Sequence, residues 1–504
     1  MIGKREYGDY QTPPAFADKV CEFLKNKRGV KPEIVLEPTC GVGNFLKSSN
    51  IFNASQYYGI EINPQYCKEC ENKIGNDKTT IINSDFFKFD LSFLKKEKLL
   101  IIGNPPWANN SMLSAFGSGN LPPKTNFKGH KGLDAITGAS NFDICEYIIL
   151  RLAKEYINTD TVIAMLCKTS VARNVFVELE RYDVKVARYE IIEFNAAKIF
   201  GINADACLLF IQMDSREKLS RSCKVYSFEN IDEVKRELKY ENGRIIDESI
   251  SRMDDFDGKC CFQWRQGVKH DCAKVMELTI KKDGLVNGNK ENVDIEENLV
   301  YPLVKSSMFK MPIIDSFSKK VIVTQRKTRE DTSYIEFAYP KTWAYLCKNR
   351  GVFDKRKSSI YREAPDFSMF GVGEYSYEKY KVGVSGFYKK PMFAVLYSPD
   401  GKPVMTDDTS YFICLSSYNN AYVAMLYLNS ERVQTFLSKI AFLDTKRPFT
   451  KKVLERIDFE KIFQKITFEE IRQTEMELGL ERYVTVEMIK DFLLEPGLNQ
   501  KRFA

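Results

Sequence analysis

The chain has 504 residues and a formal net charge of +7, and 44% of its residues are hydrophobic while 28% are charged. This balance is ordinary for a globular protein and excludes a disordered chain, and the length allows two or three domains. The sequence has no run of about 18 uncharged apolar residues and its N-terminus has no apolar signal core. We therefore expect no membrane partner and a cytoplasmic location.

The thirteen cysteines follow no disulfide framework, so we expect reduced thiols. Cys67 and Cys70 form one CxxC pair, but zinc would need a second pair or a nearby histidine. We interpret them as helix-borne thiols and expect no bound metal. His130 and His270 are the only histidines, so few residues are available for acid/base catalysis or metal binding by histidine.

In chain order, short β-rich apolar runs alternate with helical patterns from residue 34 to about 213. This alternation predicts an α/β fold with a mostly parallel sheet covered on both faces. Residues 141–157 are apolar nearly all round, as expected of a helix buried on such a sheet. Residues 109–141 are rich in Gly, Ser, Asn, Lys and Pro and predict a mobile loop. The seven predicted strands are 33–37, 57–62, 79–83, 99–103, 161–166, 186–194 and 206–213.

After about residue 215 the pattern changes to charged linkers and short aromatic strands separated by Gly, Asp and Pro turns, which predicts a second domain of mixed α+β structure. Thr467 and Glu470 have the spacing of a capping box, and Gly479 is placed to end that helix. The predicted parts of the chain are 1–215, 216–460 and a helical C-terminal segment, 461–504.

Ligands of an open parallel sheet bind beyond the carboxyl ends of its strands, and the first two predicted strands end in polar residues. The first runs into a turn, Glu37-Pro38-Thr39-Cys40-Gly41-Val42-Gly43, whose glycines allow a close backbone approach to a ligand. The second ends at Glu61, where nucleotide-binding sheets place a carboxylate for ribose hydroxyls.

The third and fourth strand ends also carry polar groups. The third is followed by Asp85, an acceptor for an adenine amino group, and by Phe86, a ring that can pack on the base. The fourth runs into Asn104-Pro105-Pro106-Trp107. Each feature alone is weak, but four such ends in succession indicate a nucleotide-type ligand.

The stretch from Lys305 to Lys357 has thirteen Lys and Arg against five Asp and Glu, interleaved with aromatic residues. This pattern suits a phosphate backbone and exposed bases. It equally suits a solvated surface above an aromatic core, so composition leaves both interpretations open.

In this motif order the chain resembles the amino-group DNA methyltransferases that use S-adenosylmethionine. It follows their gamma order, in which the cofactor half precedes an NPP[YFW] motif and target recognition comes last. The resemblance covers roughly residues 7–213 by motif and the remainder by position. It implies a Rossmann-like seven-stranded class I methyltransferase domain and a C-terminal target-recognition domain.

The resemblance also implies roles in cofactor binding. The segment from Tyr10 to Pro13 is expected to fold over the methionine part of the cofactor, and Glu61 and Asp85 to bind its ribose and adenine. The cofactor-binding residues implied are Tyr10, Gln11, Thr12, Pro13, Glu37, Thr39, Cys40, Gly41, Gly43, Glu61, Ile62, Asp85, Phe86 and Asn104.

The catalytic residues implied are Asn104, Pro105, Pro106 and Trp107. The exocyclic amine of a nucleobase is a poor nucleophile, and two acceptors placed on its hydrogens favour a more reactive geometry. Asn104 offers its side-chain oxygen and Pro105 its carbonyl, while the methyl donor is already an activated sulfonium. Trp107 and Phe200 are expected to stack on an extruded target base, with Phe194 as the alternative to Phe200.

The implied partner is duplex DNA in a restriction-modification system, with any cognate restriction endonuclease a separate chain and this protein a monomer. We expect the loop 109–141, with Lys124, Lys128, His130 and Lys131, to order over cofactor or DNA. Lys168 is expected at the same rim without an assigned role. We expect no nuclease in this chain, and the residues expected to contact DNA are Arg326, Lys327, Arg329 and Lys389.

Transfer to the N6 amine of adenine is the predicted activity, and three alternatives stay open. An NPP motif also suits the N4 amine of cytosine. It suits an amide or amine in RNA or in a protein glutamine, although the large basic tail favours DNA. A DNA-binding subunit without activity is the third alternative, against which the intact Asn104, Pro105, Glu61 and Asp85 argue.

Overall fold

The computed structural model describes residues 10–94, 98–107, 143–202, 204–213, 222–241, 244–248, 256–443, 445 and 447–499. The predicted loop 109–141, including Lys124, Lys128, His130 and Lys131, lies outside the described residues. The chain forms two compact units, Met1–Ser249 and Ile250–Ala504. All thirteen cysteines lie in described segments and are free thiols.

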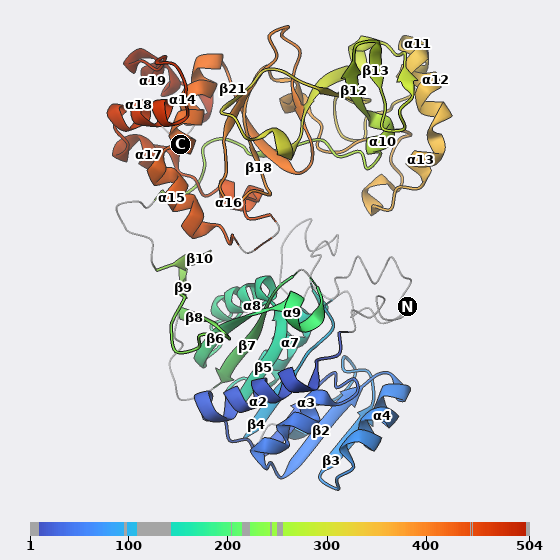
Figure 1. The fold of residues 1–504 in the computed structure, drawn as a ribbon, viewed down its shortest axis with the longest axis vertical. Helices are drawn as coiled ribbons and strands as arrows, with labels where there is room; N and C mark the ends of the chain where they lie inside the picture. Colours follow the sequence, from blue (N-terminus) through green and yellow to red (C-terminus); the bar gives the residue numbers. More distant parts are fainter. Residues whose placement is uncertain are drawn as a thin grey trace. The chain divides into compact units, whose positions relative to one another are not determined.

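A ten-stranded sheet forms the centre of the first unit, in the order β10-β9-β8-β6-β7-β5-β4-β1-β2-β3 (Figure 1). Five adjacent strands, β5, β4, β1, β2 and β3, are parallel to one another. The strand β7 is antiparallel to both of its neighbours, β5 and β6. The strands are β1 (Ile34–Glu37), β2 (Gln56–Glu61), β3 (Thr79–Asn83), β4 (Leu99–Gly103), β5 (Thr161–Lys168), β6 (Val186–Asn195), β7 (Asp205–Met213), β8 (Ser222–Ser227), β9 (Arg236–Glu241) and β10 (Arg244–Asp247). The first seven lie within two residues of their predicted bounds, which confirms the α/β class and the mostly parallel central sheet.

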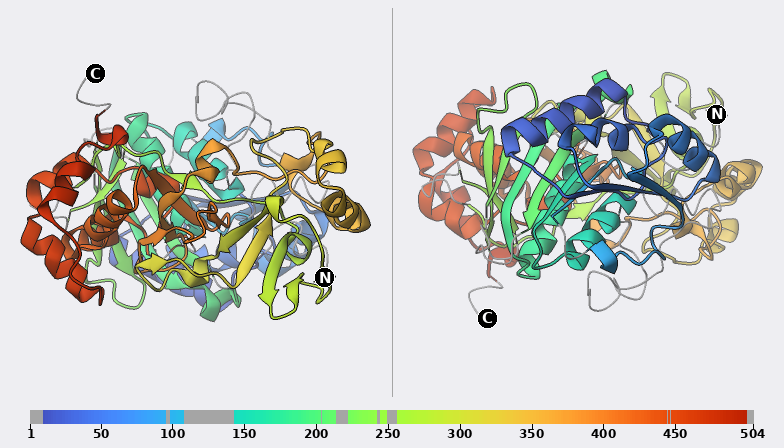
Figure 2. Two further views of the ribbon diagram at one scale, coloured as in Figure 1. Left: turned by 90° about the horizontal axis from the view of Figure 1, so that it is seen from above. Right: turned by 90° about the horizontal axis from the view of Figure 1, so that it is seen from below.

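Helices cover both faces of this sheet, as the right-hand view of Figure 2 shows for the blue and teal helices. One face carries α2 (Pro14–Arg28), α3 (Asn44–Ser48) and α4 (Pro64–Ile74), and the other carries α7 (Ile144–Glu155) and α8 (Thr169–Arg181). Every residue from 144 to 150 in α7 is buried, as its nearly continuous apolar pattern predicts. The short helix α9 (Ala196–Phe200) precedes β7.

The first unit extends beyond the boundary predicted at residue 215. The strand β8 pairs in parallel with β6, and β9 and β10 follow as antiparallel neighbours. Cys223 and Val225 of β8 are buried, as is Leu238 of β9. These strands therefore continue the first sheet through backbone pairing, and their buried apolar residues belong to the core of the first unit.

The second unit has mixed α+β structure built on two sheets, as the fold class predicted. The five-stranded sheet contains β11 (Arg265–Gln266), β21 (Ser410–Leu415), β18 (Tyr380–Ser385), β19 (Ala394–Leu396) and β16 (Ile313–Ile314). The six-stranded sheet contains β14 (Asn292–Val293), β13 (Gly284–Val286), β12 (Glu277–Lys281), β17 (Lys319–Ile322), β15 (Val300–Val304) and β20 (Met405–Thr406). The helices that precede β18 are α10 (Ala273–Met276), α11 (Tyr334–Ala338), α12 (Pro340–Lys348) and α13 (Arg350–Asp354).

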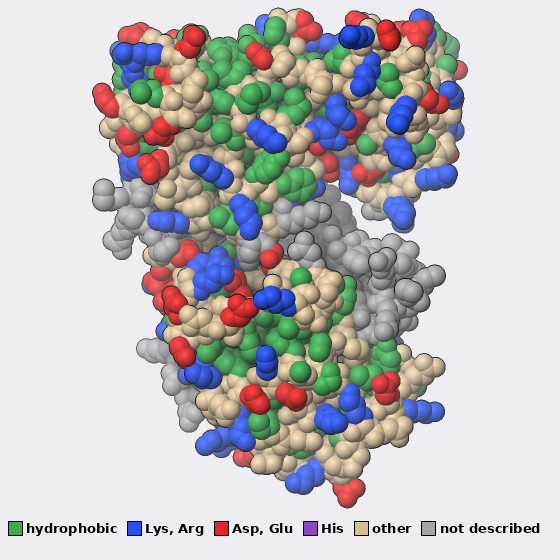
Figure 3. All heavy atoms as spheres, in the orientation of Figure 1, with side chains coloured by type: hydrophobic (Ala, Val, Ile, Leu, Met, Phe, Trp, Pro, Cys, Tyr) green, Lys and Arg blue, Asp and Glu red, His purple; other side chains and the backbone are tan. Residues whose placement is uncertain are grey.

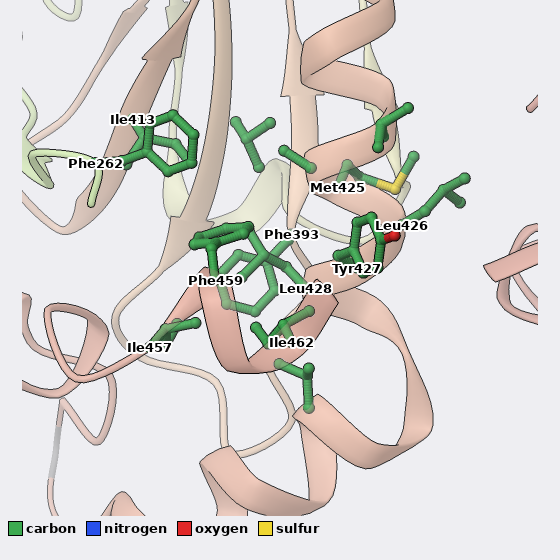
Figure 4. Packing of buried hydrophobic residues seen from close by; sticks show 14 of the residues in the cluster. Phe262, Phe393, Ile413, Met425, Leu426, Tyr427, Leu428, Ile457, Phe459 and Ile462 are labelled. Carbon is green, nitrogen blue, oxygen red and sulfur yellow. The ribbon is translucent and has the colours of Figure 1, made fainter. Parts of the chain in front are cut away.

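The C-terminal helices share one core with the five-stranded sheet. They are α14 (Tyr418–Asn429), α15 (Glu431–Ile440), α16 (Lys451–Leu454), α17 (Phe459–Lys465), α18 (Phe468–Glu477), α19 (Val486–Phe492) and α20 (Pro496–Asn499). Figure 4 shows Phe459 and Ile462 of α17 beside Leu428 of α14, in the cluster that includes Phe393 and Ile413. Residues 461–499 therefore pack as part of the second unit and not as a separate segment.

The predicted end signals of α18 are confirmed. Thr467 and Glu470 form a reciprocal capping box, and Gly479 follows the helix with φ +69°. None of the helices in the described parts of the chain is long and apolar enough to cross a membrane.

Lys381 of β18 is a charged group inside the second unit. Its side chain is 1% exposed and its ammonium donates to the carbonyls of Ser376 (3.0 Å), Glu378 (2.6 Å) and Val404 (2.9 Å). Burial lowers the pKa of Lys381 to about 8, because desolvation disfavours the charged form.

This burial predicts a pH dependence of stability. Between pH 8 and the ordinary lysine pKa of 10.5, unfolded Lys381 binds a proton that folded Lys381 does not, so the contribution of this residue to the free energy of unfolding rises with pH. We expect this lysine to add about 1.5 kcal/mol to the free energy of unfolding between pH 8 and 9.5, measured as the difference between wild type and Lys381→Met in urea titrations followed by tryptophan fluorescence, because the buried thiols contribute equally to both proteins. The Lys381→Met variant should lack this rise, and equal slopes for the two proteins would contradict the assignment.

Candidate active site

The carboxyl ends of β1, β2, β3 and β4 lie side by side at one edge of the first sheet. A pocket of about 100 Å³ opens there. Its lining includes six of the predicted cofactor or catalytic residues, namely Thr39, Glu61, Ile62, Asp85, Phe86 and Pro106 of the NPPW motif. The remaining lining residues are Pro38, Ile60, Ser84, Phe87, Ile144 and Ile148.

The turn after β1 requires both of its glycines. Gly41 has φ +50° and Gly43 has φ +75°, in the left-handed region that residues with a Cβ rarely adopt. A Cβ on Gly43 would lie 2.3 Å from the Cys70 sulfur. Glu61 fixes the turn from the end of β2, because its carboxylate accepts from the N–H groups of Gly41 (2.9 Å) and Asn63 (2.8 Å).

The side chains of Glu37 and Cys40 are buried in the protein interior and do not line the pocket. The Glu37 side chain is 3% exposed and accepts from the Leu46 N–H (3.1 Å), and burial raises the pKa of its carboxyl group well above the usual range. Cys40 is buried against Gly59, where a Cβ would lie 2.9 Å from its sulfur. Both residues therefore contact the turn from its protein side.

Asp85 and Phe86 form the far wall of the pocket. Asp85 accepts from the Phe87 N–H (2.9 Å), which holds the loop after β3. Arg151 of α7 lies 4.7 Å from the Phe86 ring centroid and donates to the carbonyls of Phe86 and Phe89. Sequence reasoning missed Arg151, since its partners are backbone groups that no motif marks.

Ile144 and Ile148 supply the apolar side of the pocket and were also missed. Their spacing of four residues on a helix predicted to be buried is the signal that could have found them. They lie on α7, whose first turn begins at the edge of the sheet that carries the site.

The segment from Tyr10 to Thr12 contacts both the glycine turn and the NPPW motif. The Thr12 carbonyl accepts from the Asn44 side chain (2.8 Å), and the Gln11 side-chain oxygen accepts from the Val42 N–H (3.4 Å). The Tyr10 carbonyl accepts from the Asn104 side-chain nitrogen (2.7 Å). Pro13 follows as the residue that precedes α2.

The bond to Tyr10 determines which end of the Asn104 amide is available. Only the NH₂ group can donate to a carbonyl, so the nitrogen faces Tyr10 and the oxygen faces away. Asn104 Oδ1 is buried and has no hydrogen-bond partner among the described residues, and the same holds for Thr39 Oγ1 on the pocket wall. Unpaired buried polar atoms are uncommon in folded proteins, and these two lie at the predicted site, so both are candidates for hydrogen bonds with a ligand.

Trp107 and Phe200 are brought together. Trp107 is 5% exposed, its indole N–H donates to the Leu166 carbonyl (3.4 Å), and its ring meets Phe200 edge to face with centroids 5.5 Å apart. The Tyr10 ring lies 6.1 Å from Trp107 and 6.5 Å from Phe200. Phe194, the alternative to Phe200, packs on Phe16 with centroids 4.9 Å apart.

Lys168, which had no assigned role, connects two parts of the site. Its ammonium lies 2.6 Å from the Asp143 carboxylate and 3.5 Å from the Trp107 carbonyl. Asp143 also caps α7 by accepting from the Cys145 N–H (3.1 Å), and burial raises the pKa of its carboxyl while the Lys168 ammonium opposes that shift. This ion pair therefore links the end of the NPPW motif to the start of α7.

The four residues predicted to contact DNA lie in loops of the second unit. Arg326, Lys327, Arg329 and Lys389 are all exposed. The Arg326 guanidinium lies 4.9 Å from the Tyr377 ring centroid, and Arg329 has a positive φ of 64°.

This sheet, with β7 antiparallel beside β5 and a ligand pocket at the ends of β1 to β4, defines a class I methyltransferase. The chain is 39% identical over 469 residues to the type II methyltransferase M.NspV of Nostoc sp. (strain ATCC 29411 / PCC 7524), covering 91% of this chain and 97% of that protein. The chain belongs to the type II methyltransferases.

Two further comparisons found a partial sequence match and a shared fold. The type II methyltransferase M.CvrRI of Paramecium bursaria Chlorella virus XZ-6E is 35% identical over 111 residues, 21% of this chain and 27% of that protein. The fold is shared with the type IIL restriction-modification enzyme MmeI, solved in complex with DNA, at a TM-score of 0.51 and 15% identity over 97% of this chain and 75% of that chain. No protein-family profile matches the sequence.

Membership of this family makes S-adenosylmethionine the methyl donor, and the residues present fit it. The Glu61 carboxylate would hold the ribose hydroxyls, and Asp85 and Phe86 would hold the adenine. The buried, unpaired Thr39 hydroxyl lies on the same wall and can serve as a further polar contact. When bound, the cofactor supplies a methyl group on a positively charged sulfur.

The contacts of Glu61 predict its effect on cofactor affinity. Glu61→Ala removes a charged acceptor and frees the Gly41 and Asn63 N–H groups, so we expect at least tenfold weaker binding of S-adenosylmethionine in titration calorimetry. The control is Glu69→Ala, which removes an exposed carboxylate from α4 of the same unit and should bind normally. Unchanged affinity in Glu61→Ala would contradict the placement of the ribose.

Proposed function

We propose that this chain is a site-specific DNA methyltransferase that transfers a methyl group from S-adenosylmethionine to the N6 amine of an adenine extruded from duplex DNA. The observation that carries the proposal is the buried, unpaired Oδ1 atom of Asn104 beside the cofactor pocket. The family membership and the fold shared with a protein solved on DNA support DNA as the substrate.

The Asn104 oxygen is suited to an amine that must lose planarity. An exocyclic amine is unreactive while its lone pair is delocalised into the ring, and acceptors on its two hydrogens favour the pyramidal form. In our proposal Asn104 Oδ1 accepts one hydrogen and the Pro105 carbonyl accepts the other. These fixed dipoles also stabilise the positive charge that develops on the nitrogen during transfer. Pro105 and Pro106 have restricted φ angles, which hold the two acceptors in place.

The aromatic residues of the site would receive the base. A base in a duplex is out of reach of such a pocket, so it must leave the stack, and contacts with aromatic side chains offset part of that free energy. A base held between two rings needs about 7 Å between their planes, twice a normal carbon–carbon contact. Trp107 and Phe200 meet edge to face at 5.5 Å, so we propose that these rings separate as the base enters.

The remaining assignments follow from the same proposal. The second unit would be the target-recognition part, and Arg326, Lys327, Arg329 and Lys389 would contact the duplex. We propose that the enzyme acts as a monomer, with any cognate restriction endonuclease a separate chain. Phosphate contacts would set the position on DNA, and side chains at base edges would select the sequence.

Asn104→Ala tests the acceptor directly. Loss of one fixed hydrogen-bonding group at the reacting centre typically lowers turnover by about 10² to 10³-fold, and we expect at least that loss of methyl transfer to plasmid DNA. Binding of S-adenosylmethionine should persist in calorimetry. The control is Asn72→Ala, an exposed asparagine of α4 in the same unit, which should retain activity. Near-normal turnover in Asn104→Ala would refute the role of this residue.

A labelling experiment tests the target base. The protein is incubated with plasmid and with S-adenosylmethionine that carries a tritiated methyl group. We expect enzymatic digestion of the plasmid to release the label as N6-methyl-2′-deoxyadenosine. Label in N4-methyl-2′-deoxycytidine would show that the target base is cytosine and not adenine. The proposed role of the Asn104 and Pro105 oxygens would then be unchanged. Label that enters RNA or protein but not DNA would refute the proposed substrate.

A further inference from the structure

A cavity of about 340 Å³ in the second unit lies between α13 and the loop that follows it. Four basic residues line it, Arg350, Arg356, Lys357 and Arg362, together with Ser358 and Tyr361. Asp354 and Asp366 also line it, which leaves an excess of two positive charges at the cavity. We infer that this cavity binds a backbone phosphate of the DNA, an inference that rests on the proposed function.

Two of the cations are available to a ligand. Arg350 forms an ion pair with Asp366 (2.7 Å), so these two side chains neutralise each other. Lys357 and Arg362 are exposed and form no ion pair with any residue that the structure describes. A concave site with uncompensated positive charge concentrates its field and attracts anions.

Arg356 is held in place before any ligand arrives. Its guanidinium donates to the carbonyls of Phe353 (3.1 Å) and Ser368 (2.6 Å) and lies 3.8 Å from the Tyr361 ring centroid. These bonds use the Nε and Nη1 atoms, so the Nη2 donors are not engaged by them. A preorganised guanidinium loses little side-chain entropy when it binds a phosphate.

The cavity is joined to the loop that carries three of the predicted DNA contacts. Thr324 donates to the Phe367 carbonyl (2.9 Å) and Thr332 donates to the Asp366 carbonyl (2.5 Å), and these two threonines flank residues 326–329. Phe367 and Asp366 belong to the cavity wall. Figure 3 shows Lys and Arg side chains gathered over α12 and α13. Two side-chain-to-backbone hydrogen bonds therefore connect the basic loop to the cavity wall.

A phosphate is the anion that this arrangement fits within the proposed function. It has oxygens in several directions, which can meet a fixed guanidinium and two mobile cations at once. Contacts of this kind set the position of a protein on DNA and carry no sequence information. We therefore assign the cavity to positioning of the duplex and not to reading of the recognition sequence.

The test compares two double variants with equal loss of charge. Lys357→Ala with Arg362→Ala alters the cavity, and Arg482→Ala with Lys490→Ala removes one arginine and one lysine that are exposed at the C-terminal end of the same unit. Affinity for duplexes with and without the recognition sequence is measured over a range of salt concentrations. For the cavity variant we expect equal weakening on both duplexes and a salt slope smaller by about 1.

Three outcomes would overturn the inference while leaving the proposed function intact. In the first, the DNA affinity of the cavity variant has the same salt dependence as that of the control variant, and the cavity variant methylates DNA normally. Another is weakening confined to the recognition sequence, which would indicate base reading. The third is thermal stabilisation of the wild-type protein by millimolar inorganic phosphate that the cavity variant lacks, without any change in DNA affinity, which would indicate a site for a free anion. Absence of DNA binding by the wild-type protein would instead refute the proposed function itself.

Discussion

The hydrogen bond from the Asn104 amide nitrogen to the Tyr10 carbonyl is the constraint on which the site depends. It joins a segment before the first helix to a strand end ninety-four residues later, and it fixes the amide so that its oxygen is left without a partner among the described residues. A buried acceptor of this kind carries an unmet desolvation penalty of about 1 to 3 kcal/mol. In the proposed reaction, the substrate amine would recover that free energy by donating to Asn104 Oδ1.

The sheet brings the rest of the site to the same place. Parallel pairing of β1 with β2 and β4 puts the glycine turn, Glu61 and the NPPW motif at one edge. The glycine turn is possible only without side chains at its left-handed positions, and Glu61 holds it through the Gly41 N–H. Lys168 then connects the last residue of the motif to Asp143 at the start of α7. Each group is thus positioned by backbone that the sheet makes rigid.

Sequence reasoning located the strands and their polar ends because both follow from local patterns, namely apolar runs and the residues directly after them. The lining of the pocket by Thr39, Glu61 and Asp85 follows once the strands are parallel neighbours. The contacts of Arg151 and the pairing of Lys168 with Asp143 are long-range and have no local signature. The boundary near residue 215 was placed too early because short strands look alike whether they join the first sheet or a new one.

The aromatic cluster of Tyr10, Trp107 and Phe200 has a thermodynamic consequence for substrate selection. Because these rings already shield one another from water, a base entering as proposed would exchange ring–ring contacts for ring–base contacts and would gain only the difference. Stacking then discriminates weakly between one heterocycle and another. In the proposed function, the choice of substrate would therefore come chiefly from directional bonds at the edge of the base, where an ill-matched group would leave a buried acceptor unsatisfied.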